Sequence, residues 1–112
     1  MSGIQTFKYK RQKITVIFWN TKVWFYAREI CQIVKCSKKD DMHRLFCILA
    51  EYMPEEDKLR KLRIRLFSAS GLQYLVKRVT MKPQRKEKLK EFCEWVEQEV
   101  MPVFDEYLRS WL

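Results

Sequence analysis

The stretch that most constrains the fold is residues 66–80, where an apolar run meets a serine-rich turn and a helical pattern follows. One buried helix face is indicated by the i, i+3, i+4, i+7 spacing of Leu72, Leu75, Val76 and Val79. Ser68 or Ser70 can cap the first turn, and Gly71 lets the backbone enter the helix tightly. The stretch therefore predicts a strand that leads directly into an amphipathic helix.

The length of the chain allows one packed core. Its 112 residues are 47% hydrophobic and include two glycines and three prolines, so we expect a single domain over residues 1–112 without long linkers. Neither a signal-peptide pattern nor an apolar run long enough to cross a bilayer is present in the sequence. We therefore expect an intracellular protein without a membrane partner, whose four cysteines are reduced thiols.

The order of patterns indicates the fold class. Aromatic and β-branched runs predict strands at residues 6–9, 14–19 and 23–26. Helical spacing predicts helices at residues 27–34, 40–53 and 84–100, with Pro102 breaking or restarting the last one. We expect an α+β fold: a small antiparallel β-sheet packed against several short helices and one longer C-terminal helix.

Residues 58–65 alternate basic and apolar side chains, which predicts a strand. Its leucines would face the core, and Arg63 and Arg65 would project together from the opposite side. Two roles remain open for such a strand: a basic stripe that binds a ligand, or an edge strand that its charges protect from aggregation.

The net charge of +9 is distributed in blocks. Residues 1–39, 40–57, 58–90 and 91–112 carry net charges of +8, −5, +11 and −5. We expect the basic side chains of residues 58–90 to gather on one surface that attracts phosphates, unless the blocks neutralise each other within the fold or between copies. The acidic block argues against a helix-turn-helix whose second helix, at residues 40–53, enters a major groove.

The predicted helix at residues 84–100 has its charges arranged against its dipole. Lysines and an arginine occupy its first half, and glutamates occupy its second half. Antiparallel packing of two such helices would place lysines beside glutamates, so a homodimer through this helix is one hypothesis.

Three segments in the same order resemble the Bro-N domain, named from baculovirus repeated open reading frame proteins and shared with prophage antirepressors. The first is Val-Trp-Phe-Tyr-Ala-Arg-Glu-Ile at residues 23–30, and the second is Phe-Ser-Ala-Ser-Gly-Leu at residues 67–72, followed by Leu75. The third segment comprises Phe92, Trp95, Val96 and Val-Met-Pro at residues 100–102. The resemblance spans about Phe7 to Phe104.

This resemblance implies a compact α+β domain that binds DNA and regulates viral or phage gene expression, often as the N-terminal part of a longer protein. It also implies a location in the host nucleus for a eukaryotic virus and in the cytoplasm for a phage. The chain departs from the family pattern where Glu29 replaces the usual Asp and Gln73 stands where Tyr is common.

We therefore predict a non-enzymatic DNA-binding module without a cofactor, whose partner is double-stranded DNA. The predicted phosphate contacts are Arg60, Lys61, Arg63, Arg65, Lys77, Arg78, Lys82, Arg85 and Lys86. The alternative is a viral protein-interaction module or inhibitor that uses the same fold to bind a host protein. Catalysis is not predicted, because the chain has no phosphate-binding glycine loop and its single histidine has no nucleophile and acid at a diagnostic spacing.

A metal site is a weaker hypothesis. The spacing C-x4-C-x6-H-x3-C places four candidate ligands in one short segment, at Cys31, Cys36, His43 and Cys47. This spacing fits no common zinc pattern, and cysteine is often a small core residue.

Overall fold

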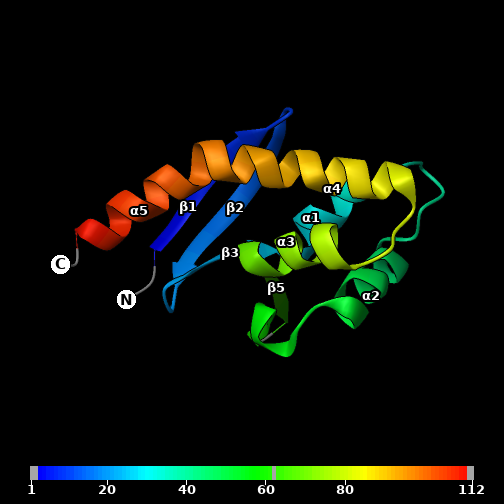
Figure 1. The fold of residues 1–112 in the computed structure, drawn as a ribbon, viewed down its shortest axis with the longest axis horizontal. Helices are drawn as coiled ribbons and strands as arrows, with labels where there is room; N and C mark the ends of the chain where they lie inside the picture. Colours follow the sequence, from blue (N-terminus) through cyan, green and yellow to red (C-terminus); the bar gives the residue numbers. More distant parts are fainter. Residues whose placement is uncertain (1–2, 62, 111–112) are drawn as a thin grey trace.

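A five-stranded antiparallel sheet forms one layer of the molecule (Figure 1). The structure is a computed structural model, and it describes residues 3–61 and 63–110. The strands are β1 (Gly3–Tyr9), β2 (Gln12–Trp19), β3 (Lys22–Tyr26), β4 (Lys58–Lys61) and β5 (Ile64–Ser68), in the sheet order β1-β2-β3-β5-β4. The three N-terminal strands predicted from aromatic and β-branched runs are confirmed, and the fold is α+β.

The segment predicted as one strand at residues 58–65 is instead a hairpin. β4 pairs with β5, so that Arg60 lies opposite Arg65, and Arg63 lies in the turn. Arg63 and Arg65 therefore do not project from one continuous strand. The alternation of basic and apolar residues runs through the turn without a Gly, Pro or Asn to mark it, which is why periodicity alone missed it. The predicted inward residue Leu62 lies outside the described residues.

The predicted short helices are confirmed. They are α1 (Ala27–Val34), α2 (Met42–Tyr52) and α3 (Ala69–Arg78), and a 3₁₀ turn, η1 (Glu55–Asp57), precedes β4. The side chain of Asp41 caps α2 by accepting a hydrogen bond from the His43 amide, 2.9 Å away. Of the two serines considered for the cap of α3, Ser68 accepts from the Gly71 amide at 3.0 Å.

The C-terminal helix does not break at Pro102. α4 (Pro83–Trp95) continues through a π-helical turn, η2 (Val96–Val100), into α5 (Met101–Arg109). In the π turn the Met101 amide bonds to the Val96 carbonyl, five residues back. A wider turn directly before a proline, which has no amide hydrogen of its own, allows the helical path to continue.

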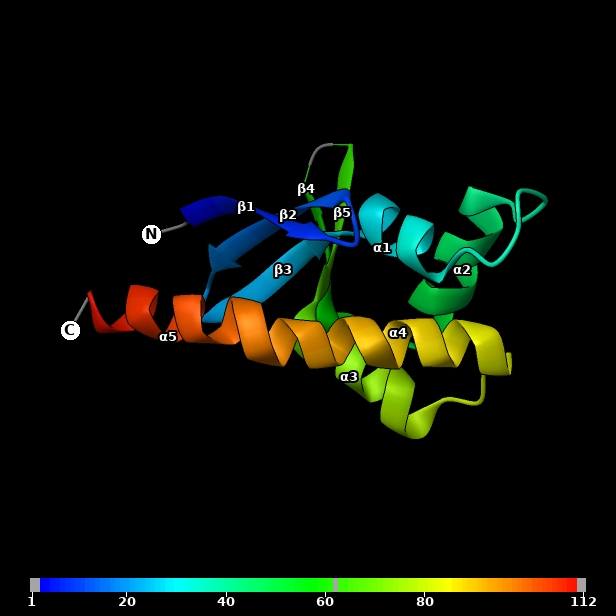
Figure 2. The ribbon, with the colours of Figure 1, turned by 90° about the horizontal axis from the view of Figure 1, so that it is seen from above.

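The long helix crosses one face of the sheet, and the core lies between them (Figure 2). Its aromatic side chains meet those of the strands: Phe92 contacts Tyr9 with ring centroids 5.2 Å apart, and Phe104 contacts Phe18 at 5.1 Å. These rings are all less than a tenth exposed. Burial of such large apolar surfaces is the main stabilising contribution in a domain of this size.

Several charges of α4 have partners within the chain. Arg85 lies 3.6 Å from Asp40, Lys88 Nζ donates to the Lys35 carbonyl at 2.6 Å, and Glu91 pairs with Lys10. These contacts offset part of the unfavourable arrangement of charge along the helix dipole. The homodimer through residues 84–100 stays a prediction.

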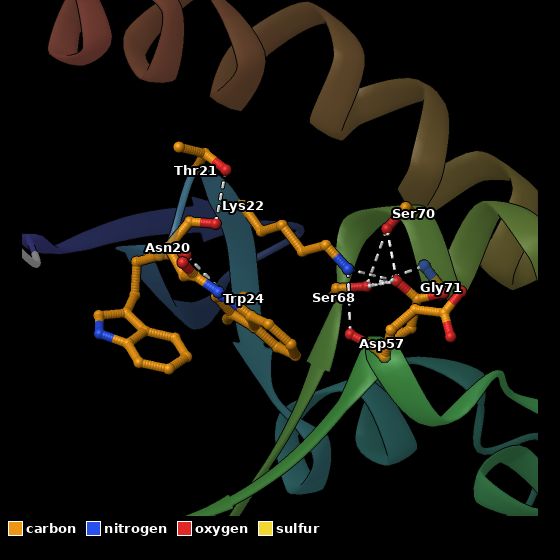
Figure 3. A network of polar contacts seen from close by, with 10 residues as sticks. Asn20, Thr21, Lys22, Trp24, Asp57, Ser68, Ser70 and Gly71 are labelled. Carbon is orange, nitrogen blue, oxygen red and sulfur yellow. Dashed lines mark hydrogen bonds and ion pairs between the residues drawn. The ribbon is translucent and has the colours of Figure 1, made fainter.

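A buried carboxylate holds the base of the β4–β5 hairpin (Figure 3). Asp57 precedes β4, and its Oδ1 accepts hydrogen bonds of 2.6 Å from both Ser68, the last residue of β5, and Ser70 in α3. Lys22, the first residue of β3, places its Nζ 3.3 Å from the same oxygen. Burial raises the pKa of Asp57, but the three donors outweigh it and hold that pKa below the ordinary value of 3.8.

Replacing this carboxylate by an amide tests the clamp. Asp57→Asn should lower the free energy of unfolding at pH 7 by about 1–3 kcal/mol, because a buried acceptor of charge-assisted hydrogen bonds is lost. The native pKa lies below 3.8, so the ionised carboxylate stabilises the fold above that pH, and this contribution disappears as the pH falls through the native pKa. Urea unfolding should therefore show a gap between variant and parent that is wide at pH 7 and becomes narrower as the pH falls below 3.8. A gap independent of pH would contradict this assignment.

Gly71 is required for space, since its φ is not positive. A Cβ at this position would lie 2.7 Å from Asp57 Cβ and 2.8 Å from Met53 Sδ. Gly71→Ala should therefore destabilise the fold by about 1–2 kcal/mol, although alanine in a helix favours it by up to about 1 kcal/mol. Gln73→Ala in the same helix is the control, and thermal melting is the measurement. A Gly71→Ala protein at least as stable as its parent would contradict the claim that Asp57 and Met53 leave no space for a Cβ at this position.

Candidate nucleic-acid interface

The nine predicted phosphate-binding residues separate into two groups. Arg60, Lys61, Arg63 and Arg65 belong to the β4–β5 hairpin, whereas Lys77, Arg78, Lys82, Arg85 and Lys86 belong to the end of α3, the start of α4 and the loop between them. Figure 2 shows the hairpin turn and the α3–α4 connection on opposite sides of the molecule. The structure therefore does not gather the basic side chains of residues 58–90 on one surface.

Two members of the hairpin group, Arg63 and Arg65, line a groove between α1, α2 and β5. The groove has a volume of about 670 Å³, and its walls carry Arg28, Arg63, Arg65 and His43, with Tyr26 and Phe46 among the aromatic lining. No carboxylate lines it in the part of the chain that the structure describes. We call this site the arginine groove, defined by Arg28, Arg63 and Arg65.

Arg65 is held in place by an aromatic stack. Its guanidinium carbon lies 4.9 Å from the centroid of the Phe46 ring. Phe46 also packs against Phe67, whose ring is nearly parallel to its own, with an interplanar angle of 4° and a centroid separation of 5.5 Å. This cation–π contact orients the guanidinium before any ligand arrives, which lowers the entropic cost of binding.

Arg63 and Arg28 extend the same positive surface from two other segments. Arg63 lies in the hairpin turn and Arg28 in the first turn of α1, and both are exposed. The start of α1 has no side-chain cap, and its first turn holds one acidic residue, Glu29, beside Arg28. Two segments that are distant in the sequence, α1 and the β4–β5 hairpin, thus contribute arginines to one groove.

The acidic residues of the neighbouring segments are directed elsewhere. Glu29, next to Arg28, accepts hydrogen bonds from the amide and the hydroxyl of Thr15 at 2.6 and 3.1 Å. Asp41 is used in capping α2. The groove is lined by residues from the first half of α2. Glu51 lies near the C-terminal end of α2, and η1 follows that end. Among the described residues, the carboxylates of residues 40–57 are therefore not part of the groove lining.

The predicted phosphate-binding residues of α3, α4 and their connecting loop differ in how accessible they are to a ligand. Arg85 is paired with Asp40, and its side chain is 13% exposed, while Lys86 is half-buried. Lys77, Arg78 and Lys82 are exposed. Of the first group, Arg60 is exposed on β4, and the side chain of Lys61 lies outside the described residues.

The candidate metal ligands do not form a complete site. Among the described residues, no group of three or more His, Cys, Asp or Glu side chains is placed to hold a metal ion. His43 and Cys47 are in contact, with Nε2 and Sγ 3.6 Å apart, but the Sγ of Cys36 donates to the Val34 carbonyl. Burial, with a smaller contribution from Cys47, raises the pKa of Cys31 to about 12.

Sequence reasoning missed the contribution of Arg28 and of the first half of α2 to this site. Arg28 is a single cation beside a glutamate in a segment that was interpreted by its aromatic residues. Only the packing of α1 and α2 beside the hairpin brings it to Arg63 and Arg65. A weak sequence signal exists in the helical i, i+4 spacing of the two groove residues Arg28 and Gln32.

Comparisons of this chain with protein-family models, with curated proteins and with solved structures found no match. The resemblance to the Bro-N domain stays a prediction. Within the described residues, no helix is long and apolar enough to span a membrane.

Proposed function

We propose that the chain is a non-enzymatic DNA-binding module that holds the phosphate backbone in the arginine groove. The observation that carries this proposal is the convergence of Arg28, Arg63 and Arg65 on one concave surface that no carboxylate of the described residues lines. Guanidinium groups form bidentate hydrogen bonds with phosphate oxygens, and they stay charged at any physiological pH.

The electrostatics of the whole chain support the same partner. A net charge of +9 on a domain of 112 residues attracts polyanions over long range and accelerates their association. Arg60 and Arg65 lie directly opposite each other across the hairpin. This pairing places a further cation next to one of the groove arginines.

The chemistry of the groove supports binding over catalysis. Cys31 lines the groove together with His43, which is the combination found in thiol nucleophiles. However, burial raises the pKa of Cys31 to about 12, so its thiol stays protonated at neutral pH. A catalytic cysteine requires a lowered pKa, so this pair is poorly suited to nucleophilic chemistry.

We include in this proposal a regulatory role in viral or phage gene expression, which is what the Bro-N resemblance implies. The homodimer through residues 84–100 is also retained, because the lysine-rich and glutamate-rich halves of that helix complement each other when antiparallel. Neither is needed for the arginine groove to bind a phosphate backbone.

Charge reversal in the groove tests the proposal. Arg28→Glu combined with Arg63→Glu should weaken binding to a short fluorescent duplex on all sequences. The slope of log K against log salt should become shallower by about 2, since each lost phosphate contact removes about one counterion. Fluorescence anisotropy between 50 and 200 mM salt, a range over which phosphate contacts weaken strongly, is the measurement.

The matched control is Arg11→Glu combined with Arg109→Glu, which makes the same change in net charge at exposed positions outside the groove. Its salt slope should stay close to that of the parent. Equal losses in both double variants would mean that only net charge matters and would contradict a specific groove. No duplex binding by the parent at low salt would instead favour the protein-interaction alternative.

A further inference from the structure

We propose that one copy of this chain bridges two separate segments of DNA, with one in the arginine groove and the other on a second basic surface. This inference rests on the proposed function. We call the second surface the helical corner, and we define it by Lys77, Arg78, Lys82 and Lys86. It consists of the last turn of α3, the first turn of α4 and the loop between them.

The helical corner presents a cluster of cations, most of which are exposed to solvent. Lys77, Arg78 and Lys82 are exposed, and none of the four side chains has an ion pair within the described residues. Arg85, which lies among them, is different because Asp40 neutralises it. The cations of the corner therefore remain available to an external anion.

Two of these cations do not serve helix stability. Lys77 and Arg78 complement the negative end of the α3 dipole, but Lys82 and Lys86 lie at the positive end of α4, where like charge is unfavourable. The first turn of α4 also lacks an acidic residue that would compensate for them. An anionic ligand is the partner that this arrangement of charge favours.

The two surfaces are far enough apart to act independently. Figure 1 looks down the shortest axis of the molecule, so the vertical direction of Figure 2 is that axis, and it measures 25 Å. The hairpin turn lies at one end of it and the α3–α4 connection towards the other, with the core between them (Figure 2). The extent of the molecule along this axis is about three times the screening length of about 8 Å at physiological salt. A duplex held on one side therefore leaves the other side open to a second duplex.

A capture assay tests bridging directly. One duplex is immobilised on beads, and a second, fluorescent duplex in solution is recovered only if a protein holds both. The parent chain should recover the second duplex at protein concentrations below saturation of the DNA. Arg78→Glu combined with Lys82→Glu should reduce recovery by about tenfold or more, because the second duplex loses its phosphate contacts. Its affinity for a single duplex should stay within about threefold of the parent value.

Controls separate bridging from loss of charge and from dimerisation. Arg11→Glu combined with Arg109→Glu should recover the second duplex as the parent does, and melting curves verify that every variant is folded. A dimer that bridges through its two arginine grooves would be insensitive to the corner variant. Undiminished recovery by that variant would therefore overturn the inference.

The possible failures are distinguishable. If the parent chain binds a single duplex but never recovers a second one, bridging is wrong and the proposed function stands. If the parent chain binds no duplex at low salt, the proposed function is wrong, and bridging falls with it.

Discussion

The hydrogen-bonded carboxylate of Asp57 is the interaction on which the position of the candidate site depends. It lies immediately before β4, and Ser68, which bonds to it, ends β5, so the network closes the base of the hairpin. The same carboxylate reaches Ser70 in α3 and Lys22 at the start of β3. A single buried acceptor thus fixes the hairpin to both the sheet and a helix, while its turn carries Arg63 to the groove.

Hydrogen bonds within the fold hold acidic residues that neighbour the groove, and these carboxylates are not among its lining residues. Glu29 is bound by Thr15, and Asp41 is bound by the first amides of α2. The arginines are the opposite case, because the one that packs on protein, Arg65, does so on the ring of Phe46 and keeps its charge uncompensated. Local hydrogen bonding and cation–π packing together separate charges that are mixed along the sequence.

The sequence predicts most of the fold because most of its signals are local. The strand and helix of residues 64–78 follow from a hydrophobic run, a serine cap and a helical repeat, all within one short segment. Two features of the fold were not predicted from the sequence, and each has a physical reason. The turn after Lys61 lacks the usual turn residues, and the helix continues past Pro102 because a π turn precedes it. Neither signal is visible in periodicity.

The site was less predictable than the fold, because charge counted along the chain does not give charge in space. Residues 58–90 form one basic block in the sequence, yet the fold divides them between two sides of the molecule. Conversely, Arg28 joins Arg63 and Arg65 only through the packing of α1 and α2 beside β5. Long-range packing decides both outcomes, and no pattern within a short window of sequence contains it.

The central claim is that the three arginines of the groove contact phosphate directly. Nuclear magnetic resonance of the ¹⁵N-labelled chain, titrated with a short duplex, observes the side-chain Nε–Hε groups of individual arginines. We predict that the resonances of Arg28, Arg63 and Arg65 shift first and that those of Arg11 and Arg109 stay in place. Unmoved groove resonances alongside shifts at Arg11 or Arg109 would contradict the account.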